Sequence, residues 1–103
     1  MQYNLDKSVL IVEDDMILTV VLERYLKKLG CIVAAKAQSG EDAIDKTKKQ
    51  QPDLIFMDIK LNGSVDGIEA MHKIREFSDV PVIYLTGNSD SATKERARKT
   101  LYA

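Results

Sequence analysis

Four short runs of apolar residues alternate with four longer amphipathic segments along the chain. The apolar runs fall at residues 8–12, 31–37, 52–58 and 80–85, and each is bounded by polar or turn-forming residues. Such runs are typical of strands buried on both faces of a parallel sheet. The segments between them carry apolar residues at helical spacing, at residues 16–29, 40–50, 67–77 and 89–101. The alternation predicts an α/β domain with a parallel sheet and right-handed crossovers.

Local signals mark the ends of the predicted helices. Ser39 and Asp42 have the spacing of a capping box, and Asp15 is placed to cap the first helix. The last helix is polar and offers few side chains to a core, so we expect it to be loosely held. The residues it has to bury are Ala92, Ala97 and Leu101.

Composition and charge narrow the possible functions. The 103 residues suffice for one domain, and 15 basic and 16 acidic side chains nearly cancel, which gives no indication of nucleic acid or an anionic membrane as partner. No apolar run approaches the roughly 20 residues of a membrane span, and no signal-peptide pattern is present, so we expect a cytoplasmic location. Cys31 is the only cysteine and is expected as a small buried hydrophobe, whereas His72 is expected at the surface.

Polar groups suited to phosphate chemistry follow three of the four predicted strands. The first strand is followed by Glu13 and Asp14, the third ends on Asp58, and the fourth is followed by Thr86. If the first and third strands are neighbours, three carboxylates converge, and their mutual repulsion calls for a hard divalent cation such as Mg²⁺. Such a site suits phosphoryl chemistry, with Asp58 as a nucleophile and the hydroxyl of Thr86 as a donor to a phosphoryl oxygen.

Four linked motifs resemble the receiver domain of two-component response regulators. The spacing between them matches across nearly the whole chain, and the motifs are residues 9–15, residues 52–58, the pair Asp66 and Gly67, and residues 81–87. The resemblance implies a flavodoxin-like (CheY-like) three-layer sandwich whose parallel sheet has the order 2-1-3-4-5.

The resemblance also implies a role for each candidate site residue. Asp58 would accept a phosphoryl group from the phosphohistidine of a sensor histidine kinase or a phosphotransfer protein. Glu13 and Asp14 match the acidic pair that holds Mg²⁺, and Lys60 matches the position that offers its backbone carbonyl to the metal. Thr86 matches the hydroxyl residue that follows the phosphoryl group when the domain switches a partner-facing or output-facing surface.

The chain stops at Ala103, where the family continues with a fifth strand, a lysine at its end and a fifth helix. We therefore expect residues 1–103 to form a receiver domain that is incomplete at its C-terminus, with the sheet order 2-1-3-4. An open edge on the fourth strand and an uncovered first helix would follow. Three explanations stay open: truncation of a longer chain in which an output domain could follow, dimerisation through the helix or the strand, and a packing of the last residues that the sequence does not indicate. The uncovered residues would be Ile17, Leu18, Val21 and Leu22.

Two other function classes stay open beside the phosphorylated switch. The first is a receiver-fold interaction module that is not phosphorylated, since no lysine of this chain can be assigned to the family's lysine position. The second is an enzyme that hydrolyses or transfers phosphate through an aspartyl phosphate. Lys60 counts against the second, because haloacid-dehalogenase-like enzymes carry an acid at that place. We predict a phosphorylatable signalling domain and not an enzyme.

Overall fold

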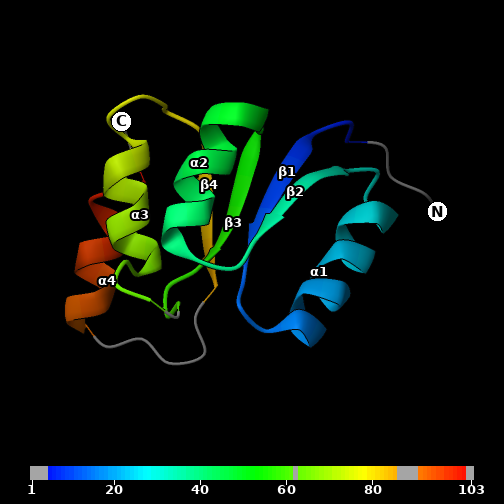
Figure 1. The fold of residues 1–103 in the computed structure, drawn as a ribbon. Coiled ribbons are helices and arrows are strands. Elements are labelled where there is room, and N and C mark those ends of the chain that lie inside the picture. The colour runs from blue at the N-terminus through cyan, green and yellow to red at the C-terminus, as the bar shows by residue number, and fades with distance from the viewer. Residues whose placement is uncertain (1–4, 62, 86–90, 102–103) are drawn as a thin grey trace.

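The computed structural model describes residues 5–61, 63–85 and 91–101, and the strands in these ranges form one parallel sheet in the order β2-β1-β3-β4 (Figure 1). The strands are β1 (Ser8–Val12), β2 (Ile32–Ala37), β3 (Leu54–Asp58) and β4 (Val82–Leu85). The helices are α1 (Met16–Lys28), α2 (Gly40–Gln50), α3 (Gly67–Ile74) and α4 (Ser91–Arg98). The predicted α/β fold and its strand order are thereby confirmed, with β1 and β3 at the centre of the sheet.

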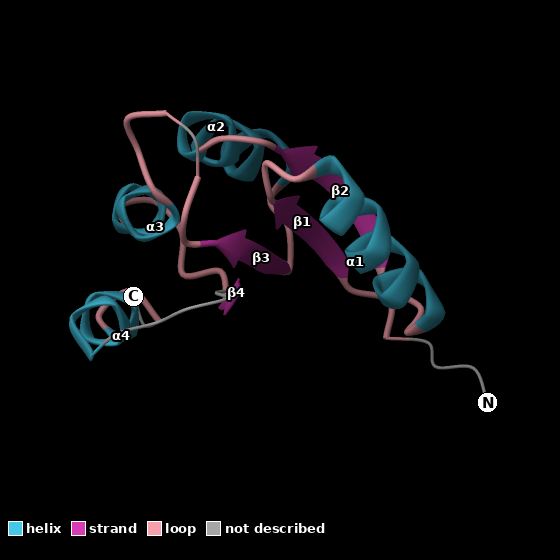
Figure 2. Cartoon of the chain, turned by 90° about the horizontal axis from the view of Figure 1, so that it is seen from below, coloured by secondary structure: helices cyan, strands magenta, loops and turns pink. Residues whose placement is uncertain are grey.

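The sheet carries an apolar core on each face. Successive residues of a strand point to opposite faces, so Leu10 packs with Ile55 and Met71 on the side of α2 and α3, and Ile11 packs near Leu26 of α1 on the other side. Figure 2 shows this arrangement from below, with α1 on one side of the strands and α2 and α3 on the other. The result is the predicted three-layer sandwich. Within the described residues, no helix has the length and apolar character needed to cross a membrane.

Side-chain caps fix the first turns of three helices. Asp15 accepts hydrogen bonds from the first backbone amides of α1, and Ser39 Oγ accepts one from the Asp42 amide at 3.1 Å. Asp66 and Glu69 form a reciprocal capping box at the start of α3, with hydrogen bonds of 2.8 and 3.2 Å. Each cap stabilises its helix by about 1 kcal/mol. The caps predicted for Asp15 and Ser39 are confirmed, and all three lie at the sheet edge where the strands end.

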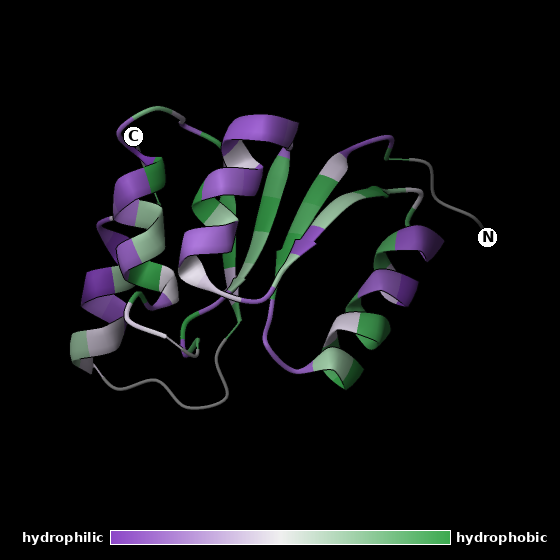
Figure 3. Ribbon diagram, in the orientation of Figure 1, coloured by the Kyte–Doolittle hydropathy of each residue, from purple (hydrophilic) through white to green (hydrophobic). Residues whose placement is uncertain are grey.

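Most apolar side chains of α1 are exposed. Ile17 is 78% exposed, and Leu18 and Val21 are exposed as well, as expected for a first helix without a second helix beside it. Leu22, which belonged to the same expectation, is half-buried against the sheet, and Leu26 is the buried residue of the helix. In Figure 3 the first turns of α1 are coloured as hydrophobic. A sheet covers only the side of a helix that faces it, so the apolar residues on the other sides of α1 are exposed.

The C-terminal segment buries a polar residue where apolar ones were predicted. Ala92 and Leu101 are exposed and Ala97 is half-buried, whereas Thr100 is fully buried. The Thr100 hydroxyl donates to the Ala97 carbonyl at 2.7 Å and is hydrogen-bonded to the phenol of Tyr84 in β4. A hydrophobicity pattern gives no signal for such a residue, because its burial depends on hydrogen bonds, one of them to a side chain 16 positions away. Helix α4 itself has no buried residue, in line with its polar sequence, and how loosely it is held stays a prediction.

Candidate functional site

Three carboxylates meet at the edge of the sheet where β1 and β3 end. The parallel register pairs Val12 with Met57, so the residues that follow at this edge lie side by side. One oxygen each of Glu13, Asp14 and Asp58 lies within 4.8 Å of the other two. The structure thus brings together the acidic residues that the sequence places at two separate strand ends. A cluster of this size and composition could hold a hard cation with oxygen ligands.

Glu13 is the buried member of this cluster. Its residue is only 4% exposed, and Oε1 accepts a hydrogen bond from the Asp15 amide at 3.1 Å. Oε2 is buried and has no hydrogen-bond partner among the described residues. Burial and, after it, the neighbouring carboxyl groups of Asp58 and Asp14 together raise the pKa of Glu13 to about 7. A buried carboxylate oxygen without a donor, beside two more carboxylates, is the pattern that a bound cation would satisfy.

Asp58 is half-buried at the end of β3, and the following loop is packed closely against it. The amide of Lys60 donates to Asp58 Oδ1 at 3.3 Å, and the amide of Gly67 donates to the Ile59 carbonyl at 2.8 Å. Gly67 approaches so closely that a Cβ atom there would lie 2.1 Å from the carbonyl oxygen of Asp58. The start of α3 and the backbone of Asp58 therefore form one closely packed corner. The side chain of Lys60 is exposed.

The fourth strand ends beside this corner. Leu85 pairs with Asp58 in the register of β3 and β4, and its carbonyl accepts a hydrogen bond from the Ile59 amide at 3.3 Å. Thr86, the hydroxyl residue expected to contact a phosphoryl group, lies outside the described residues. Its role therefore stays a prediction.

The residues that were not expected to take part in the site lie outside the carboxylate cluster. Cys31 is buried in the core beneath α1, and His72 is exposed on α3. On α2, Lys46 and Lys49 make ion pairs of 3.1 Å with carboxylates one helical turn earlier. Two features of the structure were not predicted from the sequence. The first is the burial of Glu13, which its position directly after four buried strand residues could have indicated. The second is the long-range hydrogen bonding of Arg75 and Arg96.

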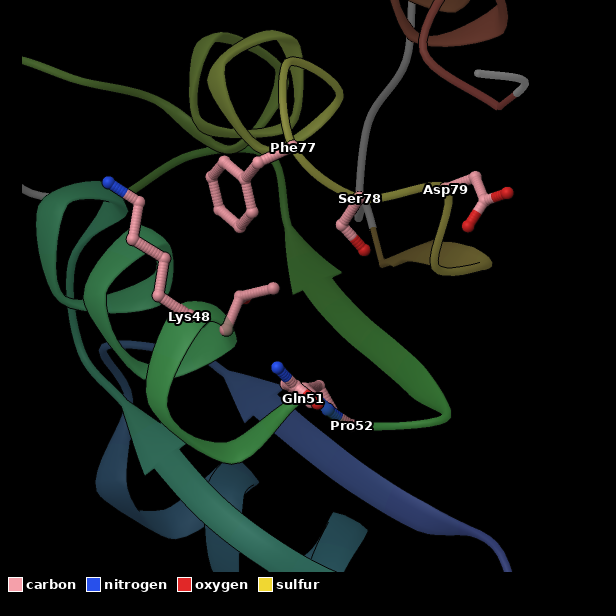
Figure 4. A pocket seen from close by; sticks show the side chains of 7 residues that line it. Lys48, Gln51, Pro52, Phe77, Ser78 and Asp79 are labelled. Atoms are coloured by element: carbon pink, nitrogen blue, oxygen red, sulfur yellow. The ribbon is translucent and has the colours of Figure 1, made fainter.

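A pocket also lies at the other end of the strands, where β3 and β4 begin. It measures about 430 Å³ and opens between the C-terminal ends of α2 and α3, and Figure 4 shows the side chains around it. The ammonium group of Lys48 lies 5.1 Å from the centre of the Phe77 ring at this place. The pocket is formed by residues that precede β3 and β4, so it is separate from the carboxylates, which follow β1 and end β3. Its lining residues are Thr47, Lys48, Gln51, Pro52, Phe77, Ser78 and Asp79.

Comparison with known proteins identifies the family. The chain matches the response regulator receiver domain over residues 9–101 and belongs to that family. It is 39% identical over 87 residues to the transcriptional regulatory protein YvrH of Bacillus subtilis, which is 84% of this chain and 36% of that protein. The chain spans between 24% and 44% of the length of the curated relatives it matches.

Solved structures agree with this assignment. The receiver domain of a modulated diguanylate cyclase from Desulfovibrio desulfuricans has a TM-score of 0.85 at 32% identity, over 92% of this chain and 75% of that one. The receiver domain of the sensor histidine kinase PA1611 from Pseudomonas aeruginosa has a TM-score of 0.80 at 31% identity, over 92% and 79%. The latter structure is described as having a magnesium ion coordinated in its active-site cleft.

Proposed function

We propose that this chain is the phosphoacceptor module of a two-component phosphorelay and that Asp58 is the residue that is phosphorylated. The observation that carries the proposal is the convergence of Glu13, Asp14 and Asp58 at one sheet edge. Asp58 is the member of the trio that ends a central strand, and it is half-buried where Glu13 is buried. A carboxylate at that place is accessible to a donor and still held in a fixed position.

Mg²⁺ is the cation that we propose for the cluster. Glu13, Asp14 and Asp58 would hold it, with the backbone carbonyl of Lys60 as a further ligand. The orphaned Oε2 of Glu13 supports this assignment, because a cation would satisfy the buried oxygen and the crowded negative charge together. When bound, the ion would neutralise carboxylate charge and balance that of an incoming phosphoryl group.

The transfer step follows from the chemistry of a carboxylate nucleophile. An oxygen of Asp58 forms a P–O bond as the P–N bond of a donor phosphohistidine breaks, and the imidazole nitrogen takes the electron pair and then a proton. The amide of Lys60, which donates to Asp58 Oδ1, orients the carboxylate for this attack. We propose that Thr86 contacts the transferred phosphoryl group. The donor would be a sensor histidine kinase or a phosphotransfer protein, and an output domain would read the result.

Phosphoryl uptake from a small-molecule donor tests the proposal. Incubation of the full chain with acetyl phosphate and Mg²⁺ should add the mass of one phosphoryl group, measured on the intact protein. Reduction with borohydride should then convert Asp58, and no other residue, to homoserine in the peptide map. Reduction at another aspartate would refute the assignment. If no mass is gained and beryllofluoride leaves the spectra unchanged, the chain is instead a receiver-fold interaction module without phosphorylation.

Magnesium should stabilise the folded chain measurably. At a concentration about ten times its dissociation constant, a ligand of the native state adds about 1.4 kcal/mol to the free energy of unfolding. We expect this increase in the unmodified chain and its loss in Asp14→Asn, followed by thermal unfolding with Mg²⁺ and with EDTA. The matched control is Asp45→Asn, which replaces an exposed aspartate on α2 that forms an ion pair with Lys49 and should keep the full magnesium effect. An equal response of all three proteins would place the ion elsewhere.

A further inference from the structure

Helix α4 is fastened to the rest of the molecule by polar contacts more than by packing. None of its residues is buried, and an apolar pocket of about 220 Å³ lies beneath it, lined in part by Ile59, Tyr84 and Ala97. Figures 1 and 2 show the helix beside α3 at the margin of the molecule. Because so little apolar surface of α4 is buried, only a few interactions fix its position.

The C-terminal end of this helix is held by Arg75, the C-cap residue of α3. Its guanidinium donates to the Thr100 carbonyl at 2.7 Å and to the Val80 carbonyl at 2.6 Å, and it also reaches Ser78 and Leu101. Together with the buried Thr100, these hydrogen bonds make a firm anchor, because charged donors strengthen each bond. They lie at the end of α3 remote from Asp58.

A second contact ties α4 to the loop that follows Asp58. Arg96 donates to Asp66 Oδ2 at 3.2 Å, while Asp66 Oδ1 caps α3 through the Glu69 amide at 2.8 Å. Asp66 immediately precedes Gly67, which packs on the backbone of Asp58. The ion pair therefore joins α4 to the corner that holds the candidate phosphoacceptor. It is partly exposed, with 49% of the arginine side chain accessible, so it is weak enough to be broken and remade.

We propose that Arg96 is a positioning residue that couples α4 to the phosphoacceptor corner through Asp66. This inference rests on the proposed function, since it assumes that Asp58 receives the phosphoryl group. Added negative charge at Asp58 alters the corner formed with Gly67, and the change passes to the Asp66 carboxylate and then to Arg96. The Arg75 anchor stays in place and serves as the point about which α4 adjusts. The surface of α4 then reports the state of Asp58 to a partner.

Amide hydrogen exchange of α4 in the full chain tests this coupling. Arg96→Gln should speed exchange of α4 amides by about two- to fivefold without a phosphate mimic, as expected for loss of a partly exposed ion pair. Beryllofluoride with Mg²⁺ should change α4 exchange in the unmodified chain, and the change should be at least halved in Arg96→Gln. Arg96→Lys, which keeps the positive charge, should restore most of it. The matched control is Arg98→Gln, because Arg98 pairs with Glu95 inside the same helix at 2.8 Å.

The outcomes separate this inference from the proposed function. If Arg96→Gln binds beryllofluoride and shows the full change in α4 exchange, the coupling through Arg96 is refuted while the phosphoacceptor role of Asp58 stands. The same holds if Arg98→Gln reduces the change as much as Arg96→Gln does. If beryllofluoride does not bind the unmodified chain, the proposed function fails, and with it the coupling that rests on it.

Discussion

Replacement of Gly67 by alanine should lower the free energy of unfolding by roughly 3 kcal/mol or more, the upper range for an overpacked site. The added methyl group would lie 2.1 Å from the carbonyl oxygen of Asp58 and 2.9 Å from Cγ of Met57. The methionine side chain could move aside, but the carbonyl belongs to the last residue of a central strand. Relief requires the start of α3 to shift away from β3, which breaks the 2.8 Å hydrogen bond from the Gly67 amide to the Ile59 carbonyl.

Urea unfolding of the two proteins measures this effect. His72→Ala is the matched control, since it adds an alanine to the exposed face of the same helix and should change stability by less than about 0.5 kcal/mol. Gly67→Ala should also reduce the rate of phosphoryl uptake, because the displaced backbone is that of Asp58. A variant as stable as the control would show that the close approach of α3 to the strand end has no energetic consequence.

The strands of this fold are predictable because each has its own local signal. The run from Val9 to Val12 is apolar, ends at a polar residue and forms β1 as expected, and the capped start of α2 lies where Ser39 indicates. The predicted strand at residues 52–58 is shorter in the structure, where β3 begins at Leu54. The side chain of Asp53 instead accepts hydrogen bonds from Ser8, a partner 45 positions away that no local pattern shows.

The residues of the candidate site are also predictable from local sequence signals, but their long-range contacts are not. Asp58 and the pair Glu13 and Asp14 are visible as carboxylates at strand ends, and their convergence needs only the neighbouring placement of β1 and β3. The contact of Arg96 with Asp66 is invisible in the sequence, since it joins surface residues 30 positions apart by a flexible side chain. Periodicity predicts which face of an element is buried, but long polar side chains reach partners that it does not encode.

Replacement of Asp58 by asparagine should abolish phosphoryl uptake and stabilise the chain in buffer without magnesium. Asparagine keeps the shape of the side chain and removes one negative charge from the crowded acidic cluster. The charge of Asp58 is among the causes that raise the pKa of Glu13, as expected for two carboxyl groups that lie close together. A gain of about 1 kcal/mol in the free energy of unfolding is expected, the Coulomb energy of two unit charges roughly 4 Å apart in water-like surroundings. Mg²⁺ should reduce the gain, because the unmodified chain then loses its repulsion.

The matched variant is Asp53→Asn, which should have the opposite sign. The Ser8 amide and hydroxyl donate to Asp53 Oδ2 at 2.9 and 3.2 Å, and these donors, the amide above all, lower the pKa of Asp53. A carboxylate whose pKa is lowered by folding stabilises the native state above its unfolded pKa of about 3.9. This contribution is lost as the pH falls through the lower value of the folded state. Asp53→Asn should therefore be less stable than the unmodified chain at pH 7 and equal to it in strong acid.

Chemical unfolding with EDTA at pH 7 compares the two variants directly, and acetyl phosphate labelling follows their function. Both replacements remove one negative charge from β3 or the residue before it, so a general charge effect would move their stabilities in the same direction. Opposite changes in the free energy of unfolding would mean that the surroundings of each carboxylate determine its effect on stability. Asp53 accepts hydrogen bonds, whereas Asp58 lies close to other carboxyl groups. If Asp58→Asn still gains phosphate, Asp58 is not the site of phosphorylation. If it is less stable than the unmodified chain, charge repulsion in the acidic cluster does not destabilise the fold. In the proposed site, the carboxylate charge that destabilises the fold without Mg²⁺ is also the charge that would hold the ion for phosphoryl transfer.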